Sequence, residues 1–249
     1  MAGWLAHPVV LDPKGGADPC ASCAARPLSV CNAIGEVDLG RLAAFASVIE
    51  APAGRTFISE GQPADCFFNV TAGSAKLFKL LPDGRRQITG FVGIGHFLGL
   101  AVSDTYAFSA EAMEPVRYCR FPRPRLRALL DDFPLMEKRL LEVAANELVA
   151  AQEQMLLLGR KTARERLASF LLMQSRQGLP CGSARDRFSL PMSRGDIADY
   201  LGLTIETVCR ILSAFKREGA IVLPNPHRIE LLDRAALEAV SETGRSGAI

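Results

Sequence analysis

The stretch from Ser193 to Glu218 constrains the fold of this chain more than any other feature. Ser193 and Asp196 supply an N-cap and a first-turn acid for a short helix, which is expected to end at Gly202. Thr204 then caps a second, longer helix that reaches the end of the stretch. Two short helices joined by a tight glycine-containing turn form a helix-turn-helix.

The residues around this stretch predict a winged helix. Ala220–Leu223 and Arg228–Leu231 are strand-like and flank a Pro-Asn-Pro turn, which is the pattern of a β-hairpin. A closing helix is expected over Arg234–Val240, and Thr162–Glu165 is a capping box that opens a helix upstream. We therefore expect a winged-helix domain over residues 162–249.

The first half of the chain has a different texture. From about Ala51 to Phe121, short strand-like pieces alternate with glycine-containing turns. Regularly spaced strands of this kind predict a β-roll or barrel, expected over residues 36–133. Residues 1–35 are expected to form a loose Gly/Pro/Ala-rich arm, so the whole chain is assigned to the α+β class. The strand-like pieces include Thr56–Ile58, Cys66–Val70, Lys76–Leu80 and Gln87–Val92.

Residues 134–161 are expected to form a long helix between the two domains. Uncharged residues follow alternating three- and four-residue steps along it, the spacing of a coiled-coil seam. Such a seam favours pairing with a second copy of the chain, whereas the alternative is an ordinary amphipathic helix packed on its own domain. Gly159 is expected to stop the helix in a left-handed conformation. The seam residues are Leu141, Ala144, Leu148, Ala151, Met155 and Leu158.

Charge is unevenly distributed. From Arg160 to the end the chain carries 14 Lys and Arg against 10 Asp and Glu, whereas the first 159 residues carry 15 against 17. The basic excess makes the C-terminal part the candidate for binding an acidic polymer. The sequence has no glycine-rich phosphate loop, no Ser/His/Asp ordering and only three histidines, so an enzyme is not expected.

The cysteines and the apolar runs indicate the compartment. Three of the seven cysteines fall within twelve residues, which argues against a secreted disulfide framework. No apolar run reaches the roughly 18 residues of a membrane span, and the first residues lack the features of a signal peptide. A cytoplasmic protein is therefore expected.

One face of the second helix of the helix-turn-helix carries residues suited to reading DNA. Glu206, Cys209 and Arg210 share this face near the N-terminus, where a recognition helix meets base edges. An arginine fork matches guanine O6 and N7, and a glutamate accepts from cytosine N4; the alternative is a solvated face with an incidental Glu–Arg pair. Thr204 and Thr207 complete the expected DNA contacts. The opposite face, expected to pack inward, carries Val208, Ile211, Leu212 and Phe215.

Cys20, Cys23 and Cys31 form a Cys-x2-Cys-x7-Cys pattern near the N-terminus. Three cysteines at this spacing could hold a metal ion or an iron–sulfur cluster, although such a site usually requires a fourth ligand. A zinc ion and an iron–sulfur cluster bind the same cysteine thiolates. The spacing alone leaves both groups open. Cys66 and Cys181 have no partner at metal-ligand spacing and are interpreted as structural.

The segment Ser193–Arg210 resembles the helix-turn-helix of the cyclic-AMP receptor protein family, and within it the FNR branch of oxygen regulators. The similarity covers nearly the whole chain and includes Leu156–Lys161 and Gln87–Phe91. It implies a β-roll of the cyclic-nucleotide-binding type, a homodimer, RNA polymerase as a partner, and a palindromic double-stranded promoter site with TTGAT-like half-sites. A Glu, a Ser and an Arg read the base pairs in that branch, and here Cys209 replaces the Ser.

The same resemblance implies a [4Fe–4S] cluster. FNR-type regulators hold an oxygen-labile cluster with three N-terminal cysteines and one from the sensor domain, and Cys119 matches the latter. The resemblance therefore implies ligation by Cys20, Cys23, Cys31 and Cys119, and control of anaerobic or microaerobic genes. The alternative role for Cys119 is that of a small buried strand residue. The alternative function for the whole protein is that of a redox-responsive regulator of the same fold that holds zinc or no metal.

The ligand pocket of the cyclic-nucleotide branch is not matched. That branch places a Glu after a Gly to hold the ribose and an Arg-Ser pair to hold the cyclic phosphate, whereas this chain has Gly99-Leu100 and Phe108-Ser109. Because no arginine would neutralise the phosphate, no cyclic nucleotide is expected. Haem ligation by His7 and His96 is a weaker alternative.

Overall fold

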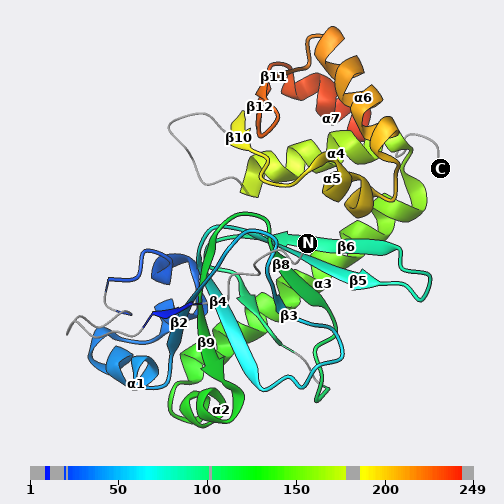
Figure 1. Cartoon of the computed structure of the whole chain (residues 1–249). Coiled ribbons are helices and arrows are strands. Elements are labelled where there is room, and N and C mark those ends of the chain that lie inside the picture. The colour runs from blue at the N-terminus through cyan, green and yellow to red at the C-terminus, as the bar shows by residue number, and fades with distance from the viewer. Residues whose placement is uncertain (1–8, 12–19, 21, 101–102, 178–185, 243–249) are drawn as a thin grey trace, which may run out of the picture. The chain divides into compact units, whose positions relative to one another are not determined.

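The structure, a computed structural model, describes residues 9–11, 20, 22–100, 103–177 and 186–242. It divides into two compact units, Met1–Val149 and Ala150–Ile249, whose boundary lies within the long helix α3 (Pro134–Arg160). The α+β class is confirmed, because a β-roll is followed by α3 and then by a winged helix (Figure 1). His7 and Cys181 lie outside the described residues.

Two antiparallel sheets make up the β-roll, and the four strand-like pieces named from the sequence are all strands. The larger sheet has the order β1-β2-β9-β4-β7 and the smaller one the order β3-β8-β5-β6. The larger sheet comprises β1 (Val9–Leu11), β2 (Ser47–Ala51), β9 (Val116–Pro122), β4 (Cys66–Ala72) and β7 (Phe97–Leu98). The smaller sheet comprises β3 (Thr56–Ile58), β8 (Ser109–Ala112), β5 (Ala75–Leu80) and β6 (Arg86–Val92).

The turn between β4 and β5 requires glycine. Gly73 has a φ of 75°, a left-handed conformation that side chains other than hydrogen rarely allow. A Cβ at this position would also clash with the carbonyl oxygen of Pro115. The turn is therefore fixed by both the backbone conformation and the close approach of a neighbouring segment.

Alternation along β4 and β9 gives the larger sheet two buried faces. Phe68 and Tyr118 face the interior of the roll, where their ring centroids lie 5.7 Å apart in an edge-on contact. Phe67 and Phe121 belong to a second apolar core. Because successive residues of a strand point to opposite faces, Cys119, two positions before Phe121, lies on the same face as Phe121. The Cys119 side chain packs against this second core.

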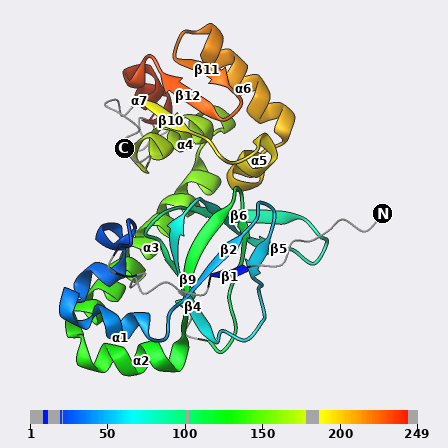
Figure 2. The same ribbon diagram turned by 60° about the vertical axis from the view of Figure 1, so that its left-hand side comes forward.

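The second core joins the N-terminal arm to the first turns of α3. Its members come from the arm, from α1 (Leu39–Ala43), from α2 (Arg123–Asp132) and from α3. Figures 1 and 2 show α1 and α2 side by side, and Arg41 of α1 pairs with Asp132 at the end of α2. Members of the core include Val30, Ile34, Leu39, Leu42, Leu126, Leu129, Met136 and Leu140.

Two parts of this region differ from the sequence expectation. The arm is not loose throughout, because two 3₁₀ turns, η1 (Arg26–Leu28) and η2 (Val30–Ala33), lie in it, and a third, η3 (Glu36–Asp38), follows directly after it. They are too short to produce a periodic apolar pattern.

Helix α2 was also not predicted. It begins with Pro124 in its first turn, a position where proline is tolerated because the missing N–H would have no partner within the helix.

Helix α3 exposes an apolar face. Leu141, Leu148 and Met155 of the predicted seam are 71%, 61% and 70% exposed. Ala144 and Ala151 are exposed as well, whereas Leu158 is partly buried within the C-terminal unit. None of the described helices is long and apolar enough to cross a membrane.

The prediction that Gly159 stops the helix is wrong. The helix continues through Arg160, and Gly159 does not adopt a left-handed conformation. The side chain of Arg166 instead donates to the carbonyl oxygens of Leu158, at 2.8 Å, and Lys161, at 2.9 Å. A neighbouring guanidinium thus satisfies helix-end carbonyls that a glycine cap would otherwise satisfy.

The C-terminal unit is the predicted winged helix. The expected capping box is present, since the carboxylate of Glu165 accepts from the Thr162 N–H at 2.8 Å. Strands β10, β12 and β11 form one small sheet (Figure 2). The elements are α4 (Ala163–Gln177), β10 (Arg187–Ser189), α5 (Arg194–Leu201), α6 (Ile205–Arg217), β11 (Ile221–Asn225), β12 (Arg228–Leu231) and α7 (Arg234–Glu242).

Candidate nucleic-acid interface and thiol cluster

Local hydrogen bonds fix the two helices of the helix-turn-helix. The hydroxyl of Ser193 accepts from the Asp196 N–H at 3.0 Å, and the Asp196 carboxylate accepts from the Ser193 N–H at 3.0 Å. Gly202, with a φ of 62°, ends α5 in the left-handed conformation. The hydroxyl of Thr204 accepts from the Thr207 N–H at 3.2 Å and begins α6. The N-caps Ser193 and Thr204 and the end of α5 at Gly202 were expected from the sequence, whereas the reciprocal bond from the Ser193 N–H to Asp196 was not.

Helix α6 separates an inward face from an exposed one. Glu206, Cys209 and Arg210 are all exposed. Hydrogen bonds from its own backbone N–H and from Thr204 lower the pKa of Glu206, so this carboxylate stays ionised and can only accept hydrogen bonds. The exposed face therefore offers an acceptor beside a permanent cation. The inward residues Val208, Ile211, Leu212 and Phe215 are buried, as predicted.

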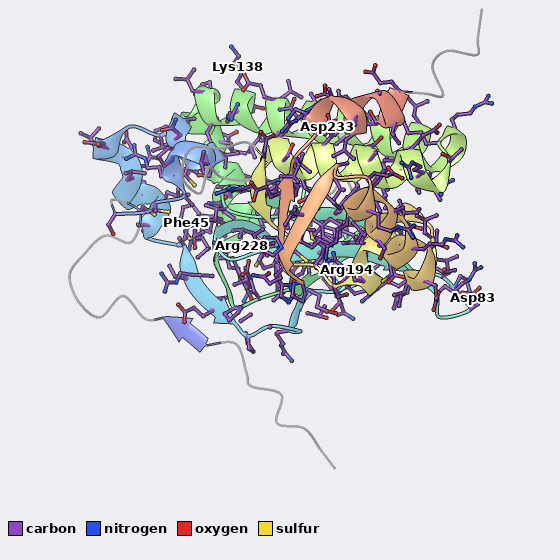
Figure 3. The ribbon with its side chains drawn as sticks, turned by 90° about the horizontal axis from the view of Figure 1, so that it is seen from above. Phe45, Asp83, Lys138, Arg194, Arg228 and Asp233 are labelled. Atoms are coloured by element: carbon purple, nitrogen blue, oxygen red, sulfur yellow. The ribbon has the colours of Figure 1, made fainter. Side chains whose placement is uncertain are left out.

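Arg194, the first residue of α5, is a candidate DNA contact that the sequence reading missed. Burial lowers the pKa of Arg194, and its guanidinium interacts electrostatically with Cys209 on the exposed face of α6. Its Nη1 is buried and has no hydrogen-bond partner among the described residues. The positive charge of Arg194, next to the exposed face of α6, is suited to attract a DNA phosphate. Figure 3 labels Arg194 and also Arg228, an exposed cation of the wing strand β12.

The structure brings the four cysteines of the predicted metal site into one neighbourhood. Cys20 and Cys31 are each 8% exposed and belong to the second core, against which Cys119 packs from β9. Cys23 follows Cys20 in a turn, with its N–H 3.4 Å from the Cys20 carbonyl oxygen. Cys31 lies in η2, whose N-terminus is capped by the Ser29 hydroxyl.

The thiols of these cysteines are close enough to influence one another. Burial, followed by the charges of Cys20, Cys23 and Cys31, raises the pKa of Cys119 to about 12. Burial also raises the pKa of Cys31. Within the described ranges, no three His, Cys, Asp or Glu side chains are already arranged to hold a metal ion. The cysteines therefore lie in one neighbourhood without ligand geometry, and the donor set fits zinc or an iron–sulfur cluster in its chemistry.

Cys66, the haem candidate His96, and Ser109 of the compared cyclic-phosphate site each have a hydrogen-bond partner nearby. Cys66 is 4% exposed inside the roll, and Arg120 Nε donates to its Sγ at 2.9 Å, in keeping with a structural role. His96 Nδ1 accepts from a backbone N–H of its own turn at 3.2 Å. The Ser109 hydroxyl, at the position compared with the cyclic-phosphate site, accepts from the Glu60 N–H at 3.0 Å.

A β-roll, a long helix with an exposed apolar face and a winged helix with a polar recognition face together define a class of DNA-binding regulator. Residues 165–240 match the Crp-like helix-turn-helix domain, and residues 48–133 match the cyclic nucleotide-binding domain. The chain therefore contains both domains of this class.

Individual relatives place the chain in one family. It is 40% identical to the nitrogen fixation regulation protein FixK of Bradyrhizobium diazoefficiens over 94% of this chain and 97% of that protein. It is 37% identical to the transcriptional activator protein FnrL of Cereibacter sphaeroides over 88% of this chain and 90% of that protein. The solved structure of FixK2 from Bradyrhizobium japonicum has a TM-score of 0.73 and 35% identity, covering 78% of this chain and 96% of that one. The chain belongs to the Crp/Fnr family of DNA-binding transcription activators, which are not enzymes, and the resemblance seen in the sequence is confirmed.

Proposed function

We propose that this protein is an oxygen-responsive member of the family that holds a [4Fe–4S] cluster through Cys20, Cys23, Cys31 and Cys119. It binds palindromic promoter DNA with TTGAT-like half-sites as a homodimer, and it acts with RNA polymerase on anaerobic or microaerobic genes. The observation that carries this proposal is the packing of Cys119, on β9, against the apolar core that contains Cys20 and Cys31 of the N-terminal arm.

The cysteines provide the chemistry of the sensor. A bound [4Fe–4S] cluster would make the site sensitive to oxygen. Cysteine thiols in apolar surroundings do not provide this sensitivity by themselves, because they stay protonated and unreactive at neutral pH. Ligation requires thiolates, so Cys31 and Cys119, whose pKa values are raised by burial, would release protons if a cluster bound. Ligands on the arm and on β9 tie these two segments together.

The second core links the cysteines to the long helix. Cys20 and Cys31 share this core with Met136 and Leu140, which lie in the first two turns of α3. A change in the order of the arm would therefore change how the first two turns of α3 are packed. This supports transmission of the state of the cysteine site to the helix that carries the predicted seam.

The exposed face of α3 supports pairing of two copies. Contiguous exposed apolar surface on a monomer is unusual and marks an interaction site, and members of this family typically bind DNA as dimers. Pairing along Leu141, Leu148 and Met155 would place two copies of α6 about one helical turn of DNA apart. A palindrome is the DNA arrangement that matches such a two-fold axis.

Anaerobic purification followed by iron and sulfide analysis tests the proposal. Wild-type protein should contain about four iron and four sulfide per chain, as the [4Fe–4S] composition requires, with a visible absorption band. Cys119→Ser should lose both, whereas the matched control Cys66→Ser should keep both because Cys66 faces the interior of the roll. Stoichiometric zinc without sulfide, or protein without any metal, would contradict the proposal and favour the zinc-containing or metal-free redox regulator.

A further inference from the structure

Two buried polar groups near the cysteines lack hydrogen-bond partners. Among the side chains of the described residues, Arg26 Nε and Asn69 Oδ1 are both buried and unsatisfied. Buried polar atoms in folded proteins are nearly always paired, and unpaired ones require an explanation. The two side chains come from different elements, yet each lies next to a cysteine of the proposed site.

Arg26 lies between Cys23 and Cys31, in η1. Its side chain is 18% exposed, and Nη2 donates to the Ile34 carbonyl oxygen at 2.9 Å. Nη1 is 3.9 Å from the carboxylate of Glu36, which is 89% exposed, so this ion pair is screened by solvent. The backbone N–H of Arg26 donates to the Cys23 carbonyl oxygen at 3.0 Å, and Ile34, which accepts from Nη2, donates its own N–H to the Cys31 carbonyl oxygen at 3.2 Å. The guanidinium thus belongs to the same set of turns as Cys23 and Cys31, and its Nε has no acceptor among the described residues.

Asn69 stands directly opposite Cys119 in the larger sheet. The two residues pair in the register of β4 and β9, so their side chains lie on the same face and are close neighbours. Asn69 is 1% exposed, and the residue two positions before it on the same face, Phe67, belongs to the second core. A half-turn of the amide exchanges its oxygen for its NH₂ group. This side chain can therefore offer a donor to the sulfur of Cys119.

We propose that Arg26 and Asn69 are positioning residues that donate N–H hydrogen bonds to the sulfur atoms of the cysteine site and so strengthen its hold on a bound cluster. This inference rests on the proposed function, because it needs a cluster held by the four cysteines. Four thiolates concentrate negative charge in apolar surroundings, where a nearby cation and nearby donors have their greatest effect. Both side chains cost free energy while they are unsatisfied. Arg26 Nε gains an acceptor when it donates to a ligating sulfur, and the Asn69 amide gains one when its NH₂ group is turned toward Cys119.

Variants that remove the donors while conserving side-chain bulk distinguish this role from a structural one. Arg26→Met removes the charge and the donors, Arg26→Lys keeps the charge without Nε, and Asn69→Leu replaces the amide by an apolar group of similar shape. Matched controls are Arg41→Met, on α1, and Asn32→Leu, an exposed residue beside Cys31. A structural role predicts a lower melting temperature of the metal-free protein. A donor role predicts an unchanged or higher melting temperature for Asn69→Leu, because a buried unsatisfied amide is removed.

The experiment measures iron and sulfide retained by each anaerobically reconstituted protein in graded concentrations of an iron chelator, and the rate of loss of visible absorbance in air. Arg26→Met and Asn69→Leu should retain the cluster roughly 10- to 100-fold less tightly than wild type, with Arg26→Lys intermediate and both controls unchanged. A wild-type protein that binds the cluster and variants that match it would overturn this inference alone. A wild-type protein without iron and sulfide would overturn both it and the proposed function.

Discussion

Arg210 is the residue on which reading of a specific base most depends. It is exposed on α6 beside the ionised carboxylate of Glu206. Arg210→Ala should weaken binding to a TTGAT palindrome by roughly 1–3 kcal/mol per half-site, and it should relax discrimination at the G. Titration of matched DNA and of DNA substituted at that G measures both effects.

A control on the same helix separates base reading from phosphate contact. Lys216 is exposed near the C-terminal end of α6, away from the N-terminal residues that meet base edges, so Lys216→Ala should leave discrimination at the G unchanged. If Arg210→Ala also lowered the affinity for both DNAs equally, Arg210 would be a phosphate contact instead of a base-reading residue.

Cys209 is either a small contact in place of serine or a second redox-sensitive position. The exposed thiol interacts with the guanidinium of Arg194. Oxidation to a sulfinate would bring negative charge to the groove and would pair with Arg194, so DNA binding should fall after peroxide treatment. Metal-free wild type, Cys209→Ser and Cys209→Ala should be compared by peroxide titration. Equal sensitivity of all three would leave Cys209 as a contact residue only.

At the scale of elements, α3 carries the prediction on dimerisation. Ala151 lies in the middle of the exposed apolar face, between Leu148 and Met155. Ala151→Glu would place like charges across the two-fold axis and should favour the monomer. Ala151→Leu should strengthen the dimer, because each added side chain would gain about 1.5–3 kcal/mol if fully buried. Sedimentation that shows no change in association for either variant would exclude this face as the interface.

The side chain of Arg166 connects the ends of two helices in the C-terminal unit. Besides its bonds to the carbonyl oxygens of Leu158, in the last turn of α3, and of Lys161, directly after α3, it donates to the carbonyl oxygen of Leu201, at the end of α5, at 2.9 Å. Because hydrogen bonds to charged groups are worth more than neutral ones, Arg166→Met should lower the free energy of unfolding by at least about 1.5–3 kcal/mol. Denaturant unfolding of the full chain measures this loss.

The appropriate comparison is an exposed arginine of the same unit. Arg187 is 69% exposed in its ion pair with Glu230, so Arg187→Met should cost about 0–1 kcal/mol. Equal losses for the two variants would mean that Arg166 does not join the helix ends in solution.

At the scale of the whole molecule, the sequence predicted the parts whose signals are local. Ser193, Gly202 and Thr204 mark helix ends with side-chain and backbone chemistry that acts over three or four residues, and the winged helix formed as expected. Helix α2 was missed because its boundary chemistry is inconspicuous, with no side-chain cap on its N-terminus. Gly159 was misread because the true cap, Arg166, comes from the next helix.

The residues of the candidate sites also differ in whether local sequence signals could predict them. The exposed residues of α6 follow from helical spacing alone, whereas Arg194 needed the packing of α5 beside α6 to be recognised. The link between Cys119 and the arm came from the family resemblance, since spacing says nothing about contacts between β9 and the arm. Asn69 could not have been found from the sequence, because its importance depends on the register that sets it opposite Cys119.

We propose that the cysteine site controls DNA binding in response to oxygen. The affinity of one anaerobically purified sample for a TTGAT palindrome, determined before and after exposure to air with Cys119→Ser treated identically, tests this proposal. Air should lower the affinity of wild type by about tenfold or more, within the usual range of coupling between two sites, while Cys119→Ser should bind weakly in both conditions. Control of DNA binding by the cysteine site would be excluded if wild-type affinity were the same before and after air although iron and sulfide had been lost.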